Sequence, residues 1–323
     1  MLKAGIGDIA YYLPPTIETN EYLVDNMGLD WTAEDIYKKT GIKQRHISVD
    51  KCASDLGYEA AVKLFNENEG LKEQIDYLLF VSQSPDYVLP ATACLLQEKL
   101  GLSKSCGAVD VNQGCSGFIY GLSIAKGLIE SGVAANILLI TAETYTKYIA
   151  PMDKSTRTIF GDGAAATWIR GFDSEYDKLS GFVLGTNGKG KDNLIVHNSG
   201  ARKEDVINNS LFMDGPEIFQ FTLMAVPKMV KGILQKENIE LDDIDYFVFH
   251  QANAFILNHL RNKLKIASER FCVDMEETGN TVSPSIPIAL QRSMERGVLQ
   301  KGMKVMIAGF GVGYSWGGCV IEI

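Results

Sequence analysis

The feature that most constrains the fold is an internal repeat. The apolar segment IDYLLFVSQS (75–84) is matched by IDYFVFHQAN (244–253), 169 residues later, and four further short matches follow in the same order at separations of 164 to 167 residues. Five ordered matches at a nearly constant offset indicate a duplicated folding unit. Because apolar strand patterns alternate with helical patterns, each copy is predicted to be an α/β unit, a mixed sheet with helices packed on it. We expect the halves to span 1–170 and 171–323 and to pack closely together.

The repeat aligns three reactive side chains. Cys115 lies where the strand pattern CGAVDV breaks and a helical pattern begins, and Asn280 occupies the same place in the second copy. His250 ends the strand that corresponds to 75–84. In a pseudo-twofold arrangement equivalent strand ends converge at the interface between the halves. We therefore expect the thiol, the imidazole and the carboxamide to meet in one cleft.

The surroundings of Cys115 favour a nucleophile. At a helix N-terminus, free backbone N–H groups and the positive end of the helix dipole favour a thiolate. Gly114, Ser116 and Gly117 are small enough to allow a sharp turn and a close approach of substrate. A buried structural cysteine is the alternative, because free cysteines are often found in cores.

Two glycine-rich segments are predicted to be structural. FGDGAAA (160–166) reads as a turn that leads into an apolar strand. GFGVGYSWGG (309–318) has the glycine content of a phosphate-binding loop, but CVIEI after it predicts a strand and not the helix that such a loop requires. This second segment better suits a tight backbone that passes beside a reactive sulfur.

Composition excludes several classes of function. The net charge of -9 argues against general nucleic-acid binding. The apolar runs are too short for a membrane span, and the first residues lack the apolar core of a signal peptide. The six cysteines have no CxxC spacing and the four histidines are scattered, so neither a disulfide framework nor a metal site is expected. These features are typical of a cytoplasmic protein with reduced thiols.

Six motifs carry a resemblance to a known family. TGIKQRHI lies near the start of the chain, and DVNQGCSGFIYGL, FGDGAA, HQAN, GNT and GFGVGYSWG follow in this order. The chain resembles the β-ketoacyl-acyl-carrier-protein synthase III family of the thiolase superfamily. The resemblance implies a five-layered αβαβα thiolase-like fold, a homodimer and a catalytic set of Cys115, His250 and Asn280. It implies no cofactor besides the phosphopantetheine of a carrier protein or coenzyme A, which delivers the acyl and malonyl groups.

The implied reaction suits these residue types. Cys115 would accept an acyl group from a thioester. His250 and Asn280 would donate hydrogen bonds to the malonyl thioester carbonyl while carbon dioxide leaves. The carbanion would then attack the acyl group on Cys115, and the backbone N–H groups of Cys115 and Val312 would bind the oxyanion. The product would be a 3-oxoacyl thioester, and an acyl carrier protein is the expected partner.

Several positions depart from the family pattern. Where the family has a tryptophan and an arginine that hold the nucleotide, this chain has Asp35 and Lys39, and Trp31 lies four residues early. Phe255 and Lys154 stand where arginines are expected. Bidentate phosphate contacts are therefore weakened, which favours a carrier-borne acyl donor over acyl coenzyme A and a specialised pathway. The expected entrance for the phosphopantetheine is formed by Lys39, Lys154, Asn253, Phe255 and Lys263.

Leu89 aligns with a family position, often phenylalanine, that reaches across the dimer and closes the acyl pocket. A smaller side chain there would admit a longer or branched acyl group. A leucine of the protein's own core is the alternative.

Other functions remain to be weighed. A cysteine protease can use the same three residue types, but the duplication argues against it. A degradative thiolase needs a second cysteine where this chain has FGVG (310–313), and a hydroxymethylglutaryl-type synthase needs a glutamate where it has Gln83. A thiolase-fold acyltransferase that forms an ester or amide is the main alternative, since it would reuse Cys115 and His250. Asn280 favours carbon–carbon bond formation. A non-catalytic subunit would not need all three residues.

Overall fold

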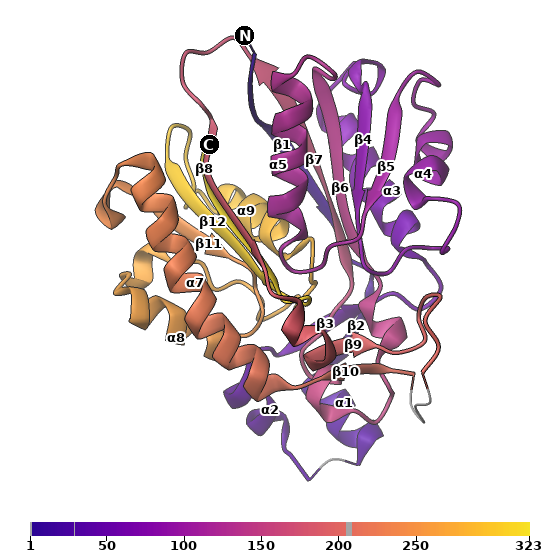
Figure 1. Cartoon of the computed structure of the whole chain (residues 1–323). Helices are drawn as coiled ribbons and strands as arrows, with labels where there is room; N and C mark the ends of the chain where they lie inside the picture. The colour runs from indigo at the N-terminus through magenta and orange to yellow at the C-terminus, as the bar shows by residue number, and fades with distance from the viewer. Residues whose placement is uncertain (1, 29, 205–208) are drawn as a thin grey trace.

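Two sheets form the centre of the molecule. The computed structural model describes residues 2–28, 30–204 and 209–323. One sheet has the strand order β1-β7-β6-β4-β5 and the other has the order β11-β12-β13-β8 (Figure 1). The strands of the first sheet are β1 (Lys3–Tyr12), β4 (Tyr77–Val81), β5 (Gly107–Val111), β6 (Asn136–Glu143) and β7 (Gly163–Phe172). Those of the second are β8 (Leu179–Thr186), β11 (Tyr246–Phe249), β12 (Lys304–Gly311) and β13 (Ser315–Glu322).

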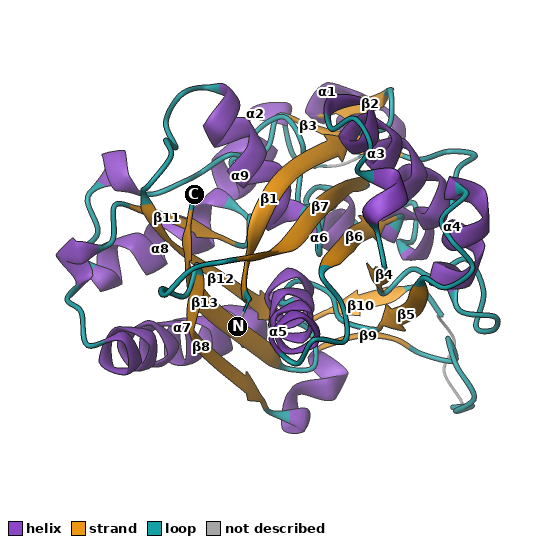
Figure 2. Ribbon diagram, turned by 90° about the horizontal axis from the view of Figure 1, so that it is seen from above, coloured by secondary structure: helices purple, strands orange, loops and turns teal. Residues whose placement is uncertain are grey.

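Helices cover both outer faces of the sheets and fill the space between them. The outer helices of the first sheet are α3 (Ala53–Glu67) and α4 (Thr92–Leu100), and those of the second are α7 (Gly215–Glu237) and α8 (Ala254–Leu264). The central helices are α5 (Gly117–Glu130) and α9 (Ser285–Glu295), and Figure 2 shows α5 end-on between the sheets. The layers therefore follow the predicted order αβαβα.

The two sheets repeat one topology. In the first sheet β6 pairs in parallel with β4 and antiparallel with β7. In the second sheet β12 pairs in the same way with β11 and β13. The counterpart of β5 is reduced to a single bridge between Phe247 and Phe271. The chain passes from the first sheet to the second between Phe172, the end of β7, and Leu179, the start of β8. The division into halves at residue 170 stays a prediction, because α5 packs on strands of both sheets and joins them in one core.

The sequence of α5 explains its central place. A helix between two sheets has to be apolar on both faces, and GFIYGLSIAKGLIE is apolar nearly all round. Gly117 and Gly121 let the helix approach the first sheet closely, since a Cβ at these positions would lie 2.5 Å from Val81 and 2.7 Å from Leu139. This close packing fixes the N-terminus of α5, and with it the turn that carries Cys115.

Shorter elements gather at one end of the two sheets (Figure 1). The segments that interrupt the repeat form much of this end. The elements are β2 (Thr16–Thr19), β3 (Gln44–Ile47), β9 (Leu194–Val196), β10 (Leu211–Met213), α1 (Asn20–Met27), α2 (Ala33–Thr40) and α6 (Lys154–Arg157). Short 3-10 helices are η1 (Lys72–Gln74), η2 (Tyr145–Tyr148), η3 (Gly188–Asn193), η4 (Leu241–Asp243) and η5 (Ser268–Arg270). None of the helices in the described ranges has the length and apolar character that a bilayer crossing needs.

Candidate active site

Cys115 lies in the turn between β5 and α5, directly before the N-cap Ser116. The side chain is buried, and Gly311 of β12 passes so close that a Cβ there would lie 2.9 Å from the sulfur. The backbone N–H groups of Cys115 and Val312 both lower the pKa of the thiol. The glycine-rich segment joins β12 to β13, and its backbone passes beside the thiol as predicted.

The predicted thiolate is not what the structure favours. Burial raises the pKa of the Cys115 thiol to about 12, and the carboxylate of Glu143 raises it further, while the two N–H groups lower it only in part. Removal of a thiolate from water therefore outweighs the two backbone N–H groups. At neutral pH the group is a thiol.

His250 follows the last residue of β11, as predicted, and its backbone N–H donates to Ala308 O at 2.7 Å. Its Nδ1 lies 2.7 Å from Ser285 Oγ, which also accepts a hydrogen bond from the Gln251 N–H at 3.4 Å. Burial lowers the pKa of His250 to about 3, so the ring is neutral. The tautomer that fits this network has Ser285 donating to Nδ1, which leaves a proton on Nε2.

Asn280 lies in a loop, five residues before α9 begins, and not at the head of the helix as the repeat predicted. A bridge to the segment at Phe160 holds its backbone, because Asn280 N–H donates to Ile159 O and Gly161 N–H donates to Asn280 O. Its Oδ1 accepts from the Val282 N–H at 2.9 Å. The amide nitrogen is thereby left as the free donor of the side chain.

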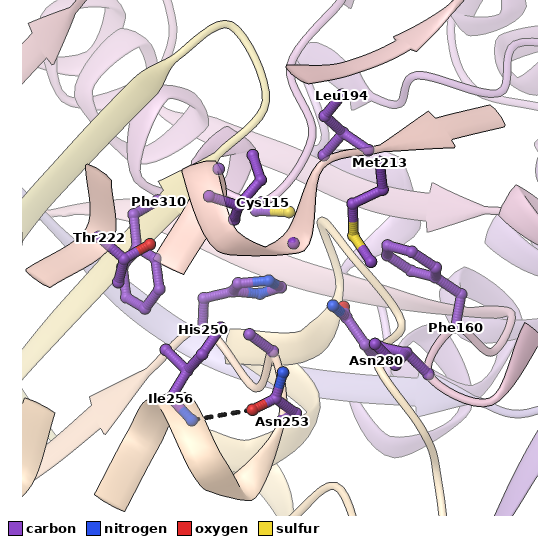
Figure 3. A pocket seen from close by; sticks show the side chains of 15 residues that line it. Cys115, Phe160, Leu194, Met213, Thr222, His250, Asn253, Ile256, Asn280 and Phe310 are labelled. Carbon is purple, nitrogen blue, oxygen red and sulfur yellow. Dashed lines mark hydrogen bonds between the residues drawn. The ribbon is translucent and has the colours of Figure 1, made fainter. Parts of the chain in front are cut away.

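One cavity of about 110 Å³ brings Cys115, His250 and Asn280 together (Figure 3). Its other lining residues are mostly apolar. They are Ile159, Phe160, Leu194, Met213, Gly215, Ile218, Thr222, Ala252, Asn253, Ile256, Phe310 and Gly311. Such a lining excludes water and strengthens hydrogen bonds to a charge that develops inside.

A second cavity of about 610 Å³ shares Leu194 with the first and is lined in part by Gln83, Tyr145, Leu211 and Val312. Tyr145 is buried in the same cluster as Cys115, and its hydroxyl donates to Gln83 Oε1 at 3.4 Å. The sequence pointed to Val312 as an oxyanion donor and to Gln83 as a position that distinguishes related enzymes, but it did not indicate Tyr145 or Leu211 as wall residues.

The predicted entrance residues fall into two groups. Asn253 lines the first cavity, where its Oδ1 caps α8 by accepting from the Ile256 N–H at 2.8 Å (Figure 3). The Nζ atoms of Lys39 and Lys154 lie 3.5 and 5.1 Å from the ring centroid of Trp31. The tryptophan is thus displaced in sequence, but in space its ring lies close to both lysines.

The remaining predicted residues lie on the surface. Phe255 is about half exposed and packs 4.2 Å from the ring of His259, between centroids. Lys263 donates to Leu223 O on α7 and lines neither of the two cavities described above. Leu89 is 80% exposed beside Val88 at 83%, so the alternative of a core leucine is wrong.

The cysteines and acidic residues give no sign of a metal centre. All six cysteines are free. Within the part of the chain that the structure describes, no three His, Cys, Asp or Glu side chains are grouped so that they could hold a metal ion.

Comparisons with known proteins agree with the motifs. Residues 109–188 match the model of the 3-oxoacyl-(acyl-carrier-protein) synthase III family, and residues 234–323 match the model of its C-terminal part. A beta-ketoacyl-(acyl-carrier-protein) synthase III from Clostridium perfringens is 38% identical, with 100% of both chains covered.

Solved structures extend the likeness to the fold. A crystal structure of a 3-oxoacyl-(acyl-carrier-protein) synthase III superposes with a TM-score of 0.97 at 45% identity, covering 99% of this chain and 100% of the other. The priming β-ketosynthase of a polyketide biosynthetic pathway superposes with a TM-score of 0.92 at 27% identity, covering 99% and 96%. The predicted thiolase-like fold is confirmed.

Proposed function

Because the chain belongs to the 3-oxoacyl-(acyl-carrier-protein) synthase III family of condensing acyltransferases, we propose that Cys115, His250 and Asn280 carry out its decarboxylative condensation. The observation that carries this proposal is their convergence on one mostly apolar cavity, with two backbone N–H groups that lower the pKa of the thiol. The three side chains come from equivalent strand and loop ends of the two halves.

Cys115 accepts the acyl group first. The sulfur attacks the acyl thioester carbon, the carbon–sulfur bond to the donor breaks, and the thiol proton ends on the released donor thiol. With a thiol pKa of about 12, proton loss has to accompany the attack. The N–H groups of Cys115 and Val312 bind the oxyanion, and one preorganised donor of this kind is worth about 3 kcal/mol.

His250 and Asn280 then act on the malonyl thioester. The Nε2 proton of His250 and the amide of Asn280 donate to its carbonyl oxygen while the carbon–carbon bond to the carboxylate breaks and carbon dioxide leaves. A neutral imidazole stabilises the enolate without being consumed as an acid. The enolate carbon attacks the acyl carbon and the bond to Cys115 breaks. The sulfur then takes up a proton from solvent, and the 3-oxoacyl thioester is released.

The acyl and malonyl groups are proposed to arrive on the phosphopantetheine of an acyl carrier protein. The entrance has ammonium groups at Lys39 and Lys154 and a phenyl ring at Phe255, so it has no guanidinium fork for a nucleotide phosphate at these positions. Acyl carrier donors should therefore acylate Cys115 faster than the matching acyl coenzyme A. Saturable acylation by acetyl coenzyme A alone would overturn this preference.

A second copy of the chain is proposed to complete the acyl cavity. Tyr87, Val88 and Leu89 form an apolar loop whose side chains are 60%, 83% and 80% exposed, which is costly unless another surface covers them. Leu89 of the copy would close the cavity of about 610 Å³ and leave room for a longer or branched acyl group.

Mass spectrometry after incubation with a panel of acyl thioesters tests the first step, and carbon dioxide release from malonyl carrier protein tests the second. We expect an added acyl mass on Cys115 and release of carbon dioxide. Acylation without any carbon dioxide release would instead favour the acyltransferase that forms an ester or amide.

A further inference from the structure

Glu143 is a buried carboxylate that the proposed reaction does not use. It is the last residue of β6 and has no exposed surface. Its oxygens accept hydrogen bonds from Ser84 Oγ at 2.8 Å, Ser283 Oγ at 2.7 Å and Ser82 Oγ at 3.3 Å. The Gln83 N–H lies 3.2 Å from both oxygens. No salt bridge reaches Glu143 in the described ranges, so neutral donors alone hold it.

These donors come from both halves of the molecule. Residues 82–84 follow β4 of the first half, whereas Ser283 belongs to the loop of the second half that carries Asn280. Glu143 therefore links the Asn280 loop to the first sheet. Ser283 Oγ also lies 3.4 Å from Val81 O, at the end of β4.

The loop needs such an anchor because its backbone is strained. Val282 has a φ of +65°, a left-handed conformation that a β-branched residue rarely adopts. The same residue donates its N–H to Asn280 Oδ1 and so sets the orientation of the carboxamide. Release of Ser283, the next residue, would let Val282 relax and turn the Asn280 amide away from the cavity.

We propose that Glu143 is a positioning residue that holds the Asn280 amide in its donor orientation and so supports the malonyl step rather than the acylation of Cys115. It lines neither of the two cavities described above, so it acts through the loop and not on substrate. This inference rests on the proposed roles of Asn280 and Cys115.

The negative charge of Glu143 makes the Cys115 sulfur less reactive, whereas its hydrogen bonds support the Asn280 loop. Burial raises the pKa of Glu143 to about 7, while the three serines and the Gln83 N–H oppose that shift. Ionised Glu143 raises the pKa of Cys115, and the groups that face it besides the thiol are the phenols of Tyr145 and Tyr148. Loss of this charge thus favours a reactive sulfur while it loosens the Asn280 loop.

Glu143→Gln in the full-length enzyme separates the two effects. Above pH 7, where the wild-type carboxylate is ionised, we expect faster alkylation of Cys115 by iodoacetamide. Carbon dioxide release from malonyl carrier protein should fall about tenfold to a hundredfold, the loss typical of a hydrogen bond to a charged group. A parallel fall of both rates, or unchanged carbon dioxide release, would overturn the proposal.

Two serine variants provide a matched pair. Ser283→Ala removes the link to the Asn280 loop and should lower carbon dioxide release without accelerating alkylation. Ser82→Ala removes a longer bond within the first half and should change neither rate. Equal effects of the two variants would contradict the proposal. Asn280→Ala is the reference: if it releases carbon dioxide at the wild-type rate, the proposed function itself fails, whatever Glu143→Gln does.

Discussion

The Cys115 turn and the Asn280 loop occupy equivalent places in the two halves, yet they are built differently. Cys115 stands directly before the N-cap of α5, in a turn held by backbone contacts and the packing of α5. Asn280 lies five residues before α9, in a loop with left-handed residues at Gly279 and Val282. Duplication thus supplied two positions facing one cavity, one for a nucleophile on a compact turn and one for a donor on an anchored loop.

The largest effect is expected on the nucleophile side. Cys115→Ala removes the one thiol among the described residues that line the cavity, so acyl attachment should fall by more than about a thousandfold. Intact-mass spectrometry after incubation with an acyl thioester measures this directly. Persistent attachment at another residue would show that the turn is not the acceptor site.

The pH dependence sharpens the chemistry of the same turn. Because the pKa of Cys115 is raised to about 12, the thiolate fraction grows with pH throughout the range below that value. The alkylation rate of Cys115 should rise about tenfold per pH unit from neutral pH upward, with no plateau before pH 10. A plateau near pH 7 would show that the helix N-terminus outweighs burial after all.

A glycine substitution should lower the stability of the protein more in the Asn280 loop than in the Cys115 turn. Gly279 has a φ of +69°, and a Cβ there would lie 3.0 Å from the backbone oxygen of Ile159 and 2.9 Å from Arg45 Cβ. Gly279→Ala should therefore lower the free energy of unfolding by about 2 to 4 kcal/mol.

Gly114→Ala is the matched change in the first half. A Cβ there would lie 2.3 Å from Gln83 Oε1, the end of a flexible side chain that can move. We expect a loss of about 1 kcal/mol, measured by urea unfolding of both variants. A larger loss at Gly114 than at Gly279 would reverse the comparison.

The smallest effect is expected at the entrance. Combined Lys39→Ala and Lys154→Ala should raise the KM for the acyl carrier about threefold to tenfold with little change in kcat, because exposed charges contribute modestly. Lys104→Ala, an exposed lysine after α4, is the control and should leave KM unchanged. An equal rise of KM in both variants would show that Lys39 and Lys154 do not form the entrance.

Much of the fold could be predicted because the repeat is local and ordered. Buried strands such as β4 and β11 are continuous apolar runs, and their ends place His250 and the Cys115 turn at one edge. The cavity walls could not be predicted, because Leu194 and Met213 reach the site from a small hairpin far away in sequence.

Three other features depend on three-dimensional packing that a sequence pattern does not display. The expected thiolate does not agree with the raised pKa of Cys115, because burial, which only the three-dimensional packing reveals, disfavours the charged form. Trp31 lies four residues early in the sequence, but α2 and α6 place Lys39 and Lys154 close to its ring. Glu143 ends an apolar run and carries no local signal of the serines that bind it.

The most direct test of the divided roles is Asn280→Ala with acylation and carbon dioxide release followed separately in the same preparation. The account predicts that acyl-Cys115 forms to the wild-type extent while carbon dioxide release from malonyl carrier protein falls by about a hundredfold or more. Carbon dioxide release at the wild-type rate, or a loss of acylation as large as the loss of release, would contradict it.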